Sequence, residues 1–222
     1  IGRAIAVKLA QAGMRLVLLG GNNPDKLEVT RLEVEKYSSC LVLPGDLTDL
    51  EFLASGIEAA HNHFGRIDIL VNNAGIPGDM SQKSYETDMH HLQETMNVNF
   101  YGTYLLTQSL IPTIANNSGR IVNITVPTEV SPYWHPLAYV ASKAAQNTIT
   151  SIMAMEFAKD NIPVETYSIH PGPTTTDLNG NMNLPGFHTA DTVGQKVAEV
   201  ISDGQCHNGE FIELYPIVDE GA

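Results

Sequence analysis

The stretch Ile67-Asp68-Ile69-Leu70-Val71-Asn72-Asn73-Ala74-Gly75 decides the fold of this chain. Its apolar part, residues 67–71, is typical of a short strand buried on both faces, and its polar end is typical of a turn. Similar runs occur at 15–19, 41–43, 120–125, 163–169 and 209–214. Helical patterns alternate with them, so we predict a parallel sheet covered by helices on both faces.

The expected helices cover residues 2–12, 24–37, 49–64, 86–115, 138–159 and 190–202. We find no linker, repeat or low-complexity stretch between them. The 222 residues therefore predict one α/β domain with a Rossmann-type, doubly wound sheet.

Composition narrows the range of partners. The formal net charge of −13 disfavours nucleic acid and anionic membranes, and no apolar run reaches the roughly 20 residues of a membrane span. Cys40 and Cys206 fit no metal-ligand pattern, so we expect free thiols in a reducing compartment, the cytoplasm, and no metal site.

Polar residues and glycines follow the predicted strands, where ligands bind in an open α/β sheet. They are Gly20-Gly21, Asp46, Asn73-Ala74-Gly75, Thr125 and Pro171-Gly172. Ordinary turns that need positive φ explain Gly75 and Gly172 equally well, and capping of the next helix is an alternative for Asp46.

Tyr139 and Lys143 stand four residues apart at the head of a predicted helix, so both side chains project from one face. An ammonium beside a phenol favours phenolate, so we expect Lys143 to lower the pKa of Tyr139. A tyrosine tuned in this way can exchange a proton with a carbonyl or alcohol oxygen.

Four motifs in this order resemble the classical short-chain dehydrogenase/reductase family: the run 71–75, the run Asn97-Val98-Asn99-Phe100-Tyr101-Gly102, the Tyr139/Lys143 pair and Pro171-Gly172. The resemblance extends from Ile1 to about Leu214. It implies an NAD(P)-dependent oxidoreductase acting on a small-molecule carbonyl or alcohol, with Tyr139 as general acid or base. Lys143 would also contact the nicotinamide ribose.

The resemblance further implies that Asn99 is catalytic and holds a water that links Lys143 to solvent; local bonding within the helix is the alternative. Dinucleotide contacts are implied for Ile1, Gly2, Asn22, Asp46, Leu47, Asn73, Ala74, Gly75, Tyr139, Lys143, Pro171, Gly172 and Thr176. Ile1 and Gly2 match the end of the family's Thr-Gly-x-x-x-Gly-Ile-Gly loop. We therefore expect the first strand and most of the phosphate loop to be missing from this sequence, as in a truncated record, because a domain without its central strand should not fold stably.

The choice between NADP and NAD depends on the end of the second strand of the family, where an acidic residue binds the ribose of NAD. Gly20, Gly21 and Asn22 occupy that place here. No carboxylate repels a 2′-phosphate, and Asn22 could donate to it, so the sequence leans slightly to NADP.

The chain departs from the family at Val126, where the catalytic serine is expected thirteen residues before the tyrosine. Thr128, Thr125 and Ser131, in this order, are the candidates to replace its hydroxyl. If none does, loss of one donor costs about 10²–10³ in rate. A catalytically impaired nucleotide-binding or scaffold subunit is then the alternative function.

The segment 173–189 is expected to be a mobile lid over the substrate. Thr128, Trp134 and Phe187, together with Tyr133, are the candidate substrate contacts; a plain surface loop explains Tyr133 and Trp134 equally well. The helices at 86–115 and 138–159 carry surplus apolar residues, and the resemblance implies pairing of these helices in a homodimer or homotetramer. The surplus residues include Leu105, Leu106, Ile149, Ile152 and Met153.

Overall fold

The computed structural model describes residues 1–21, 23–79, 81–129 and 136–215. Four parallel strands form the larger sheet, in the order β3-β4-β5-β8. Their bounds are β3 (Ile69–Asn72), β4 (Arg120–Ile124), β5 (Glu165–His170) and β8 (Phe211–Glu213). Because each pair of neighbours is joined through a helix, every connection within this sheet is a crossover, as predicted.

A second parallel pair, β1 (Leu16–Leu19) and β2 (Cys40–Leu43), forms a sheet of its own. The residues of β1 and β3 line the same cavity, which separates the two sheets. One further parallel strand between β1 and β3 would make the two sheets continuous; that strand remains a prediction.

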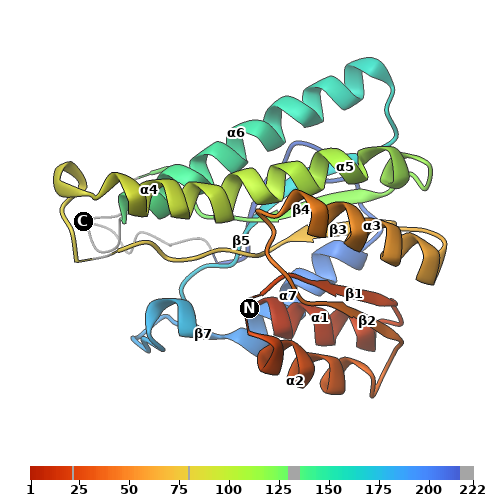
Figure 1. Ribbon diagram of the computed structural model, residues 1–222, viewed down its shortest axis with the longest axis horizontal. Helices are drawn as coiled ribbons and strands as arrows, with labels where there is room; N and C mark the ends of the chain where they lie inside the picture. Colours follow the sequence, from red (N-terminus) through yellow and green to blue (C-terminus); the bar gives the residue numbers. More distant parts are fainter. Residues whose placement is uncertain (22, 80, 130–135, 216–222) are drawn as a thin grey trace.

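Helices cover both faces of the sheets (Figure 1). On one face lie α1 (Gly2–Gln11), α2 (Pro24–Val34) and α7 (Ala190–Ser202). The other face carries α3 (Leu50–Phe64), α4 (Met89–Met96), α5 (Thr103–Ala115) and α6 (Leu137–Asp160). The prediction of a doubly wound α/β domain is therefore confirmed.

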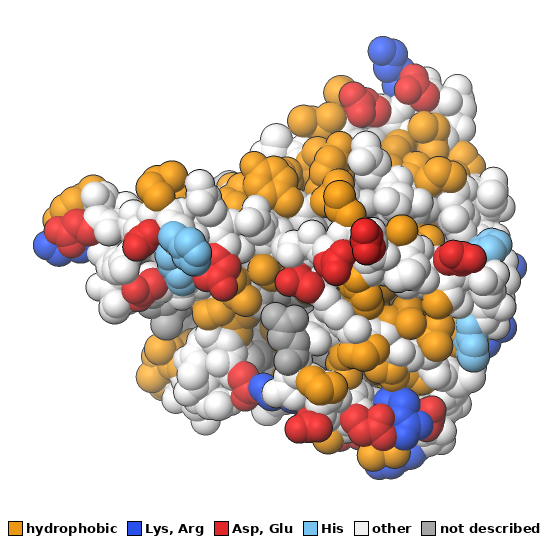
Figure 2. Space-filling model, in the orientation of Figure 1, with side chains coloured by type: hydrophobic (Ala, Val, Ile, Leu, Met, Phe, Trp, Pro, Cys, Tyr) orange, Lys and Arg blue, Asp and Glu red, His pale blue; other side chains and the backbone are white. Residues whose placement is uncertain are grey.

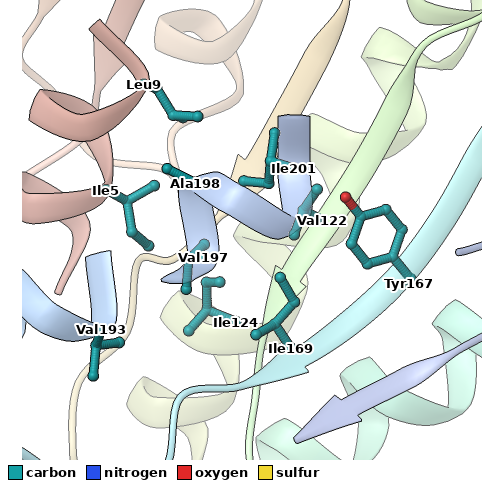
Figure 3. Packing of buried hydrophobic residues seen from close by; sticks show 10 residues of the cluster. All are labelled: Ile5, Leu9, Val122, Ile124, Tyr167, Ile169, Val193, Val197, Ala198 and Ile201. Atoms are coloured by element: carbon teal, nitrogen blue, oxygen red, sulfur yellow. The ribbon is translucent and has the colours of Figure 1, made fainter. Parts of the chain in front are cut away.

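The first hydrophobic cluster packs α7 between α1 and the larger sheet (Figure 3). Val193 and Val197 are fully buried in it. Close approach of the two helices depends on Gly194, because a Cβ there would lie 2.7 Å from the carbonyl carbon of Ala4. A side chain at this position would have to push α1 away.

The second cluster lies on the opposite face, below α3, α5 and α6. Ile114 and Ile121 are fully buried there, and Phe157 of α6 packs against them. These contacts hold α5 and α6 against the strands whose carboxyl ends form the site.

The predicted helix over 86–115 is wrong as a single regular element. A short 3₁₀ helix, η1 (Ser84–Glu86), precedes α4, and a π-helical turn, η2 (Asn97–Gly102), separates α4 from α5. Tight packing accompanies this turn: a Cβ on Gly102 would lie 2.9 Å from the carbonyl oxygen of Leu47. Such turns are frequent at functional sites.

The expected lid contains regular structure. β6 (Thr174–Thr175) pairs in parallel with β7 (His188–Thr189), and a 3₁₀ helix, η3 (Asp177–Asn179), lies between them. In the part of the chain that is described, no helix has the length and apolar character needed to cross a membrane.

Candidate active site

A large cleft opens at the carboxyl ends of the strands. Its volume of about 2900 Å³ exceeds the roughly 300–1,000 Å³ of most ligand pockets, because it continues between the two sheets. Every predicted cofactor residue within the described ranges lines it: Ile1, Gly2, Asp46, Leu47, Asn73, Ala74, Gly75, Tyr139, Lys143, Pro171, Gly172 and Thr176. Asn22 lies outside the described residues.

The N-terminus of α1 lies directly against the turn after β3. A Cβ on Gly2 would lie 2.4 Å from the side-chain nitrogen of Asn73, so only a glycine fits without a shift. The first N–H groups of a helix have no intrahelical acceptor, and the helix dipole is positive there. This corner of the cleft can therefore bind an anion such as a phosphate.

Asp46 does not cap the helix that follows it. Its Oδ1 accepts hydrogen bonds from the backbone N–H and the hydroxyl of Thr48, at 2.8 and 2.9 Å. Asp49 caps α3 instead, by accepting from the N–H groups of Glu51 and Phe52. The capping alternative for Asp46 is therefore wrong, and the side chain holds a tight turn at the edge of the cleft.

Tyr139 and Lys143 are both buried on the first turns of α6, with exposures of 9% and 2%. The Lys143 ammonium lies 5.8 Å from the centre of the Tyr139 ring. Burial raises the pKa of Tyr139 to about 12 and lowers the pKa of Lys143 to about 8. The expected lowering of the tyrosine pKa is wrong for this structure, because loss of solvent outweighs the neighbouring cation.

Two acceptors hold the Lys143 ammonium. Its Nζ donates to the carbonyl oxygen of Ile124 at 3.0 Å and to Oε1 of Gln146 at 2.9 Å. Since an ammonium has three N–H donors, one is left without a partner among the described residues. Lys143 lines the cleft, so this donor is available to a ligand.

Asn99 is fully buried and joins three elements. Its Oδ1 accepts from the N–H of Ile76 at 2.8 Å, and its Nδ2 donates to the carbonyl of Ile76 and to the hydroxyl of Ser142, each at 3.0 Å. The Ser142 hydroxyl in turn donates to the carbonyl of Tyr139. Asn99 therefore fixes the loop after β3 against α6, a role that the sequence did not reveal.

Two of the three hydroxyls expected to replace the family's serine, those of Thr125 and Thr128, lie within the described residues. Val126 is half-buried and lines the cleft, and its carbonyl accepts from Asn147 at 2.9 Å. Thr128, the first candidate, is exposed and does not line the cleft, and its assignment as a substrate contact remains a prediction. Thr125 lines the cleft, but its hydroxyl is buried and unpaired within the described structure. Ser131 lies outside the described residues.

Residues of the segment after β5 also line the cleft. Thr176 is the N-cap residue of η3 and forms a capping box with Asn179, and Phe187 also lines the cleft. Trp134 and Tyr133 lie outside the described residues. No group of metal-ligating side chains occurs among residues 1–21, 23–79, 81–129 and 136–215.

Sequence reasoning missed a buried chain of polar residues below the site. Asn72 donates to Thr107 and to Asn123, both at 2.9 Å, and Asn123 donates to Thr150 at 3.0 Å. These residues come from β3, α5, β4 and α6. Asn72 and Asn123 face each other across the β3/β4 register, which only the strand pairing could show.

Comparisons with known proteins identify the relatives of this chain. The family model described as short chain dehydrogenase matches residues 1–185. An uncharacterized oxidoreductase of Staphylococcus saprophyticus is 33% identical over 183 residues, which cover 82% of this chain and 76% of that protein. General stress protein 39 of Bacillus subtilis is 32% identical and 11-beta-hydroxysteroid dehydrogenase-like 2 of Arabidopsis thaliana is 29% identical, over 88% and 80% of this chain. The chain spans 65% and 57%, respectively, of those two relatives.

Solved structures share the fold. A 3-ketoacyl-(acyl-carrier-protein) reductase from Brucella melitensis, complexed with NADH, superimposes with a TM-score of 0.85 at 22% identity, covering 96% of this chain and 91% of that one. An alcohol dehydrogenase from the archaeon Thermococcus sibiricus, complexed with 5-hydroxy-NADP, gives 0.82 at 23% identity and covers 96% and 90% of the two chains.

Proposed function

The chain belongs to the short-chain dehydrogenase/reductase family, and from this premise we propose that it is an NAD(P)-dependent oxidoreductase that interconverts a carbonyl and an alcohol. The observation that carries the proposal is the placement of Tyr139 and Lys143. Both side chains are buried, both line the cleft, and they lie one helical turn apart. A non-enzymatic protein has no need to bury an ammonium beside a phenol.

The residues present fit a dinucleotide. Gly2 and the start of α1 form the corner suited to its phosphates. Gly75, which lines the cleft, packs closely on Asn99, because a Cβ there would lie 3.2 Å from Oδ1 of Asn99. The nicotinamide supplies or accepts the hydride when it is bound, and Pro171, Gly172 and Thr176 are the candidates to hold its carboxamide.

Tyr139 exchanges the proton. With a pKa raised to about 12, its phenol is protonated at neutral pH, which suits donation to the oxygen of a ketone or aldehyde. The remaining N–H of Lys143 can bind the ribose or stabilise the phenolate left after transfer. The same group serves both directions, as the acid in carbonyl reduction and, in its phenolate form, as the base in alcohol oxidation.

Two cations near the predicted adenosine end support NADP over NAD. Arg3 and Lys26 both line the cleft, and Lys26 forms a 2.7 Å ion pair with Asp177 of η3. A 2′-phosphate could replace Asp177 as the partner of Lys26. Fluorescence titration with NADPH and NADH tests this preference. Lys26→Ala should lower the affinity for NADPH more than the affinity for NADH, and an equal loss of both affinities would contradict the preference.

A second function is favoured by Val126. Valine cannot donate a hydrogen bond to the developing alkoxide, so the protein could be a disabled relative that binds nucleotide or acts as a scaffold. Val126→Ser separates the two. In a disabled relative the new hydroxyl should raise turnover about tenfold or more, since one such donor is worth roughly 10²–10³. In an enzyme that uses another donor, the same change should leave turnover unchanged or lower it.

The main proposal is tested by titrating the protein with both dinucleotides and then screening carbonyl substrates for oxidation of the reduced cofactor. Turnover that disappears in Tyr139→Phe, with dinucleotide affinity retained, supports it. Dinucleotide binding without turnover of any carbonyl in the screen would instead support the scaffold function.

A further inference from the structure

We propose that Gln146 is a positioning residue for the reaction, which fixes the Lys143 ammonium beside Tyr139 and ties it to the π-helical turn η2. This inference rests on the proposed function, because it assigns Gln146 a part in the same site. It starts from a side chain that the sequence motifs do not include. Gln146 is 3% exposed and lies three residues after Lys143 on α6, so both side chains point to the same face.

The hydrogen bonds of Gln146 determine its orientation. Lys143 is only a donor, so the Oε1 atom must face it, and their distance is 2.9 Å. The amide nitrogen therefore faces the opposite way, where it donates to the hydroxyl of Thr103 at 3.1 Å. Both ends of the amide are thus occupied, and neither can turn without loss of a buried hydrogen bond.

Thr103 connects this amide to the backbone of η2. Its hydroxyl lies 3.0 Å from the carbonyl oxygen of Asn99 and 2.9 Å from that of Phe100, so it can donate to either. A continuous chain of contacts therefore runs from Lys143 through Gln146 and Thr103 to the turn that carries Asn99. The same turn holds the loop after β3 through Asn99 and Ile76, which places the ammonium and the cofactor-facing loop in one rigid unit.

The carbonyl of Ile124, from β4, is the other acceptor of the Lys143 ammonium. The titratable side chain of Tyr139 lies beside this ammonium, with its ring centre 5.8 Å from Nζ. Because the ammonium is buried, its charge depends on the two acceptors. Removing the Gln146 oxygen should favour the neutral amine and allow the side chain to move away from Tyr139. A carboxylate at the same place should hold the charged form more strongly.

The test compares Gln146→Leu, Gln146→Glu and Thr150→Val in the intact protein. Thr150 is also buried on α6 and bonds the backbone carbonyl of Gln146, but it does not contact Lys143. The titration of Lys143 is followed by NMR in lysine-labelled protein, which requires no substrate. We expect the proton affinity of Lys143 to fall about tenfold in Gln146→Leu, to rise in Gln146→Glu and to stay unchanged in Thr150→Val.

Identical Lys143 titrations in Gln146→Leu and Thr150→Val would overturn the proposal. If Gln146→Leu does not fold, the isosteric variant Gln146→Glu tests the proposal alone. An unchanged proton affinity of Lys143 in Gln146→Glu would then contradict the proposal. Where turnover is measurable, the alkaline limb of the kcat profile should move to lower pH in Gln146→Leu and to higher pH in Gln146→Glu. The NMR titration of Lys143 does not depend on turnover. It therefore tests the role of Gln146 even if no carbonyl substrate is turned over and the proposed function fails.

Discussion

At the scale of one residue, burial of the Lys143 ammonium makes the stability of the protein depend on pH. Its pKa of about 8 in the folded protein lies below the ordinary value of 10.5, because burial disfavours the ammonium. Between these two values the unfolded chain binds more protons than the folded one. Stability therefore rises as the pH increases through this window.

We predict that Lys143→Met removes this rise. The free energy of unfolding of the wild type minus that of the variant should increase from about pH 8 to pH 10, because the opposing effect of Cys40, whose pKa is raised to about 11, is the same in both proteins. Above pH 10 Tyr139 acts in the opposite direction, because its raised pKa makes stability fall as the unfolded tyrosine ionises. Chemical denaturation at several pH values measures both trends; parallel curves for the two proteins would contradict the burial of a titrating lysine.

Asn99 carries the second prediction at this scale. Asn99→Ala removes the bonds to Ile76 and Ser142 and leaves buried groups unpaired, so it should destabilise the protein by about 2–3 kcal/mol. Dinucleotide affinity should fall too, since the loop after β3 is released. Asn116→Ala, at an exposed position just after α5, is the matched control and should change stability by less than about 0.5 kcal/mol. Equal losses of stability in the two variants, measured by denaturant titration, would contradict the role of Asn99 in holding the loop after β3 against α6.

At the scale of elements, the alternation of apolar runs and helical patterns was enough to predict the strands and most helices, because burial on both faces leaves a clear signal. The π-helical turn at 97–102 was not predictable in this way. It is accompanied by contacts distant in sequence, such as Gly102 against Leu47 and Asn99 against Ile76. The same limit applies to Gln146, whose partner Thr103 is 43 residues away.

The packing of α1 on α7 gives the prediction at this scale. Gly194→Ala should destabilise the protein by about 1–3 kcal/mol, because the new methyl group would meet the backbone of Ala4 at 2.7 Å. Gln195→Ala, on the exposed side of the same helix, should be nearly neutral. Thermal unfolding of both variants checks this, and a Gly194→Ala protein as stable as the control would show that the helices can separate without loss.

At the scale of the whole molecule, the surface bears on the expected pairing of helices between copies of the chain. Figure 2 shows apolar side chains gathered over the region of α5 and α6, on a face that also carries many acidic groups. Ile152 and Met155 of α6 are 43% and 64% exposed, whereas Leu106, which we expected at an interface, is buried in the protein's own core. The expected interface therefore has to use the outer positions of α6.

We propose a homodimer or homotetramer that pairs these helices, and predict that the double change Ile152→Asp and Met155→Asp lowers the mass measured by light scattering to that of a smaller assembly. Aspartate disfavours association because it is charged at the centre of the contact. The same replacement at Leu50 of α3, which is 62% exposed, should leave the mass unchanged. A monomeric wild type at micromolar concentration would contradict the assembly itself.

The central claim is that the Tyr139 hydroxyl transfers the proton, and one measurement tests it most directly. Turnover and dinucleotide affinity of Tyr139→Phe are compared with those of the wild type, using the best carbonyl substrate from the screen. We predict a loss of turnover of about 10²–10⁴-fold, the usual contribution of a general acid, with dinucleotide affinity nearly unchanged because the ring remains in place. Retention of more than about a tenth of the wild-type rate would contradict this role for Tyr139.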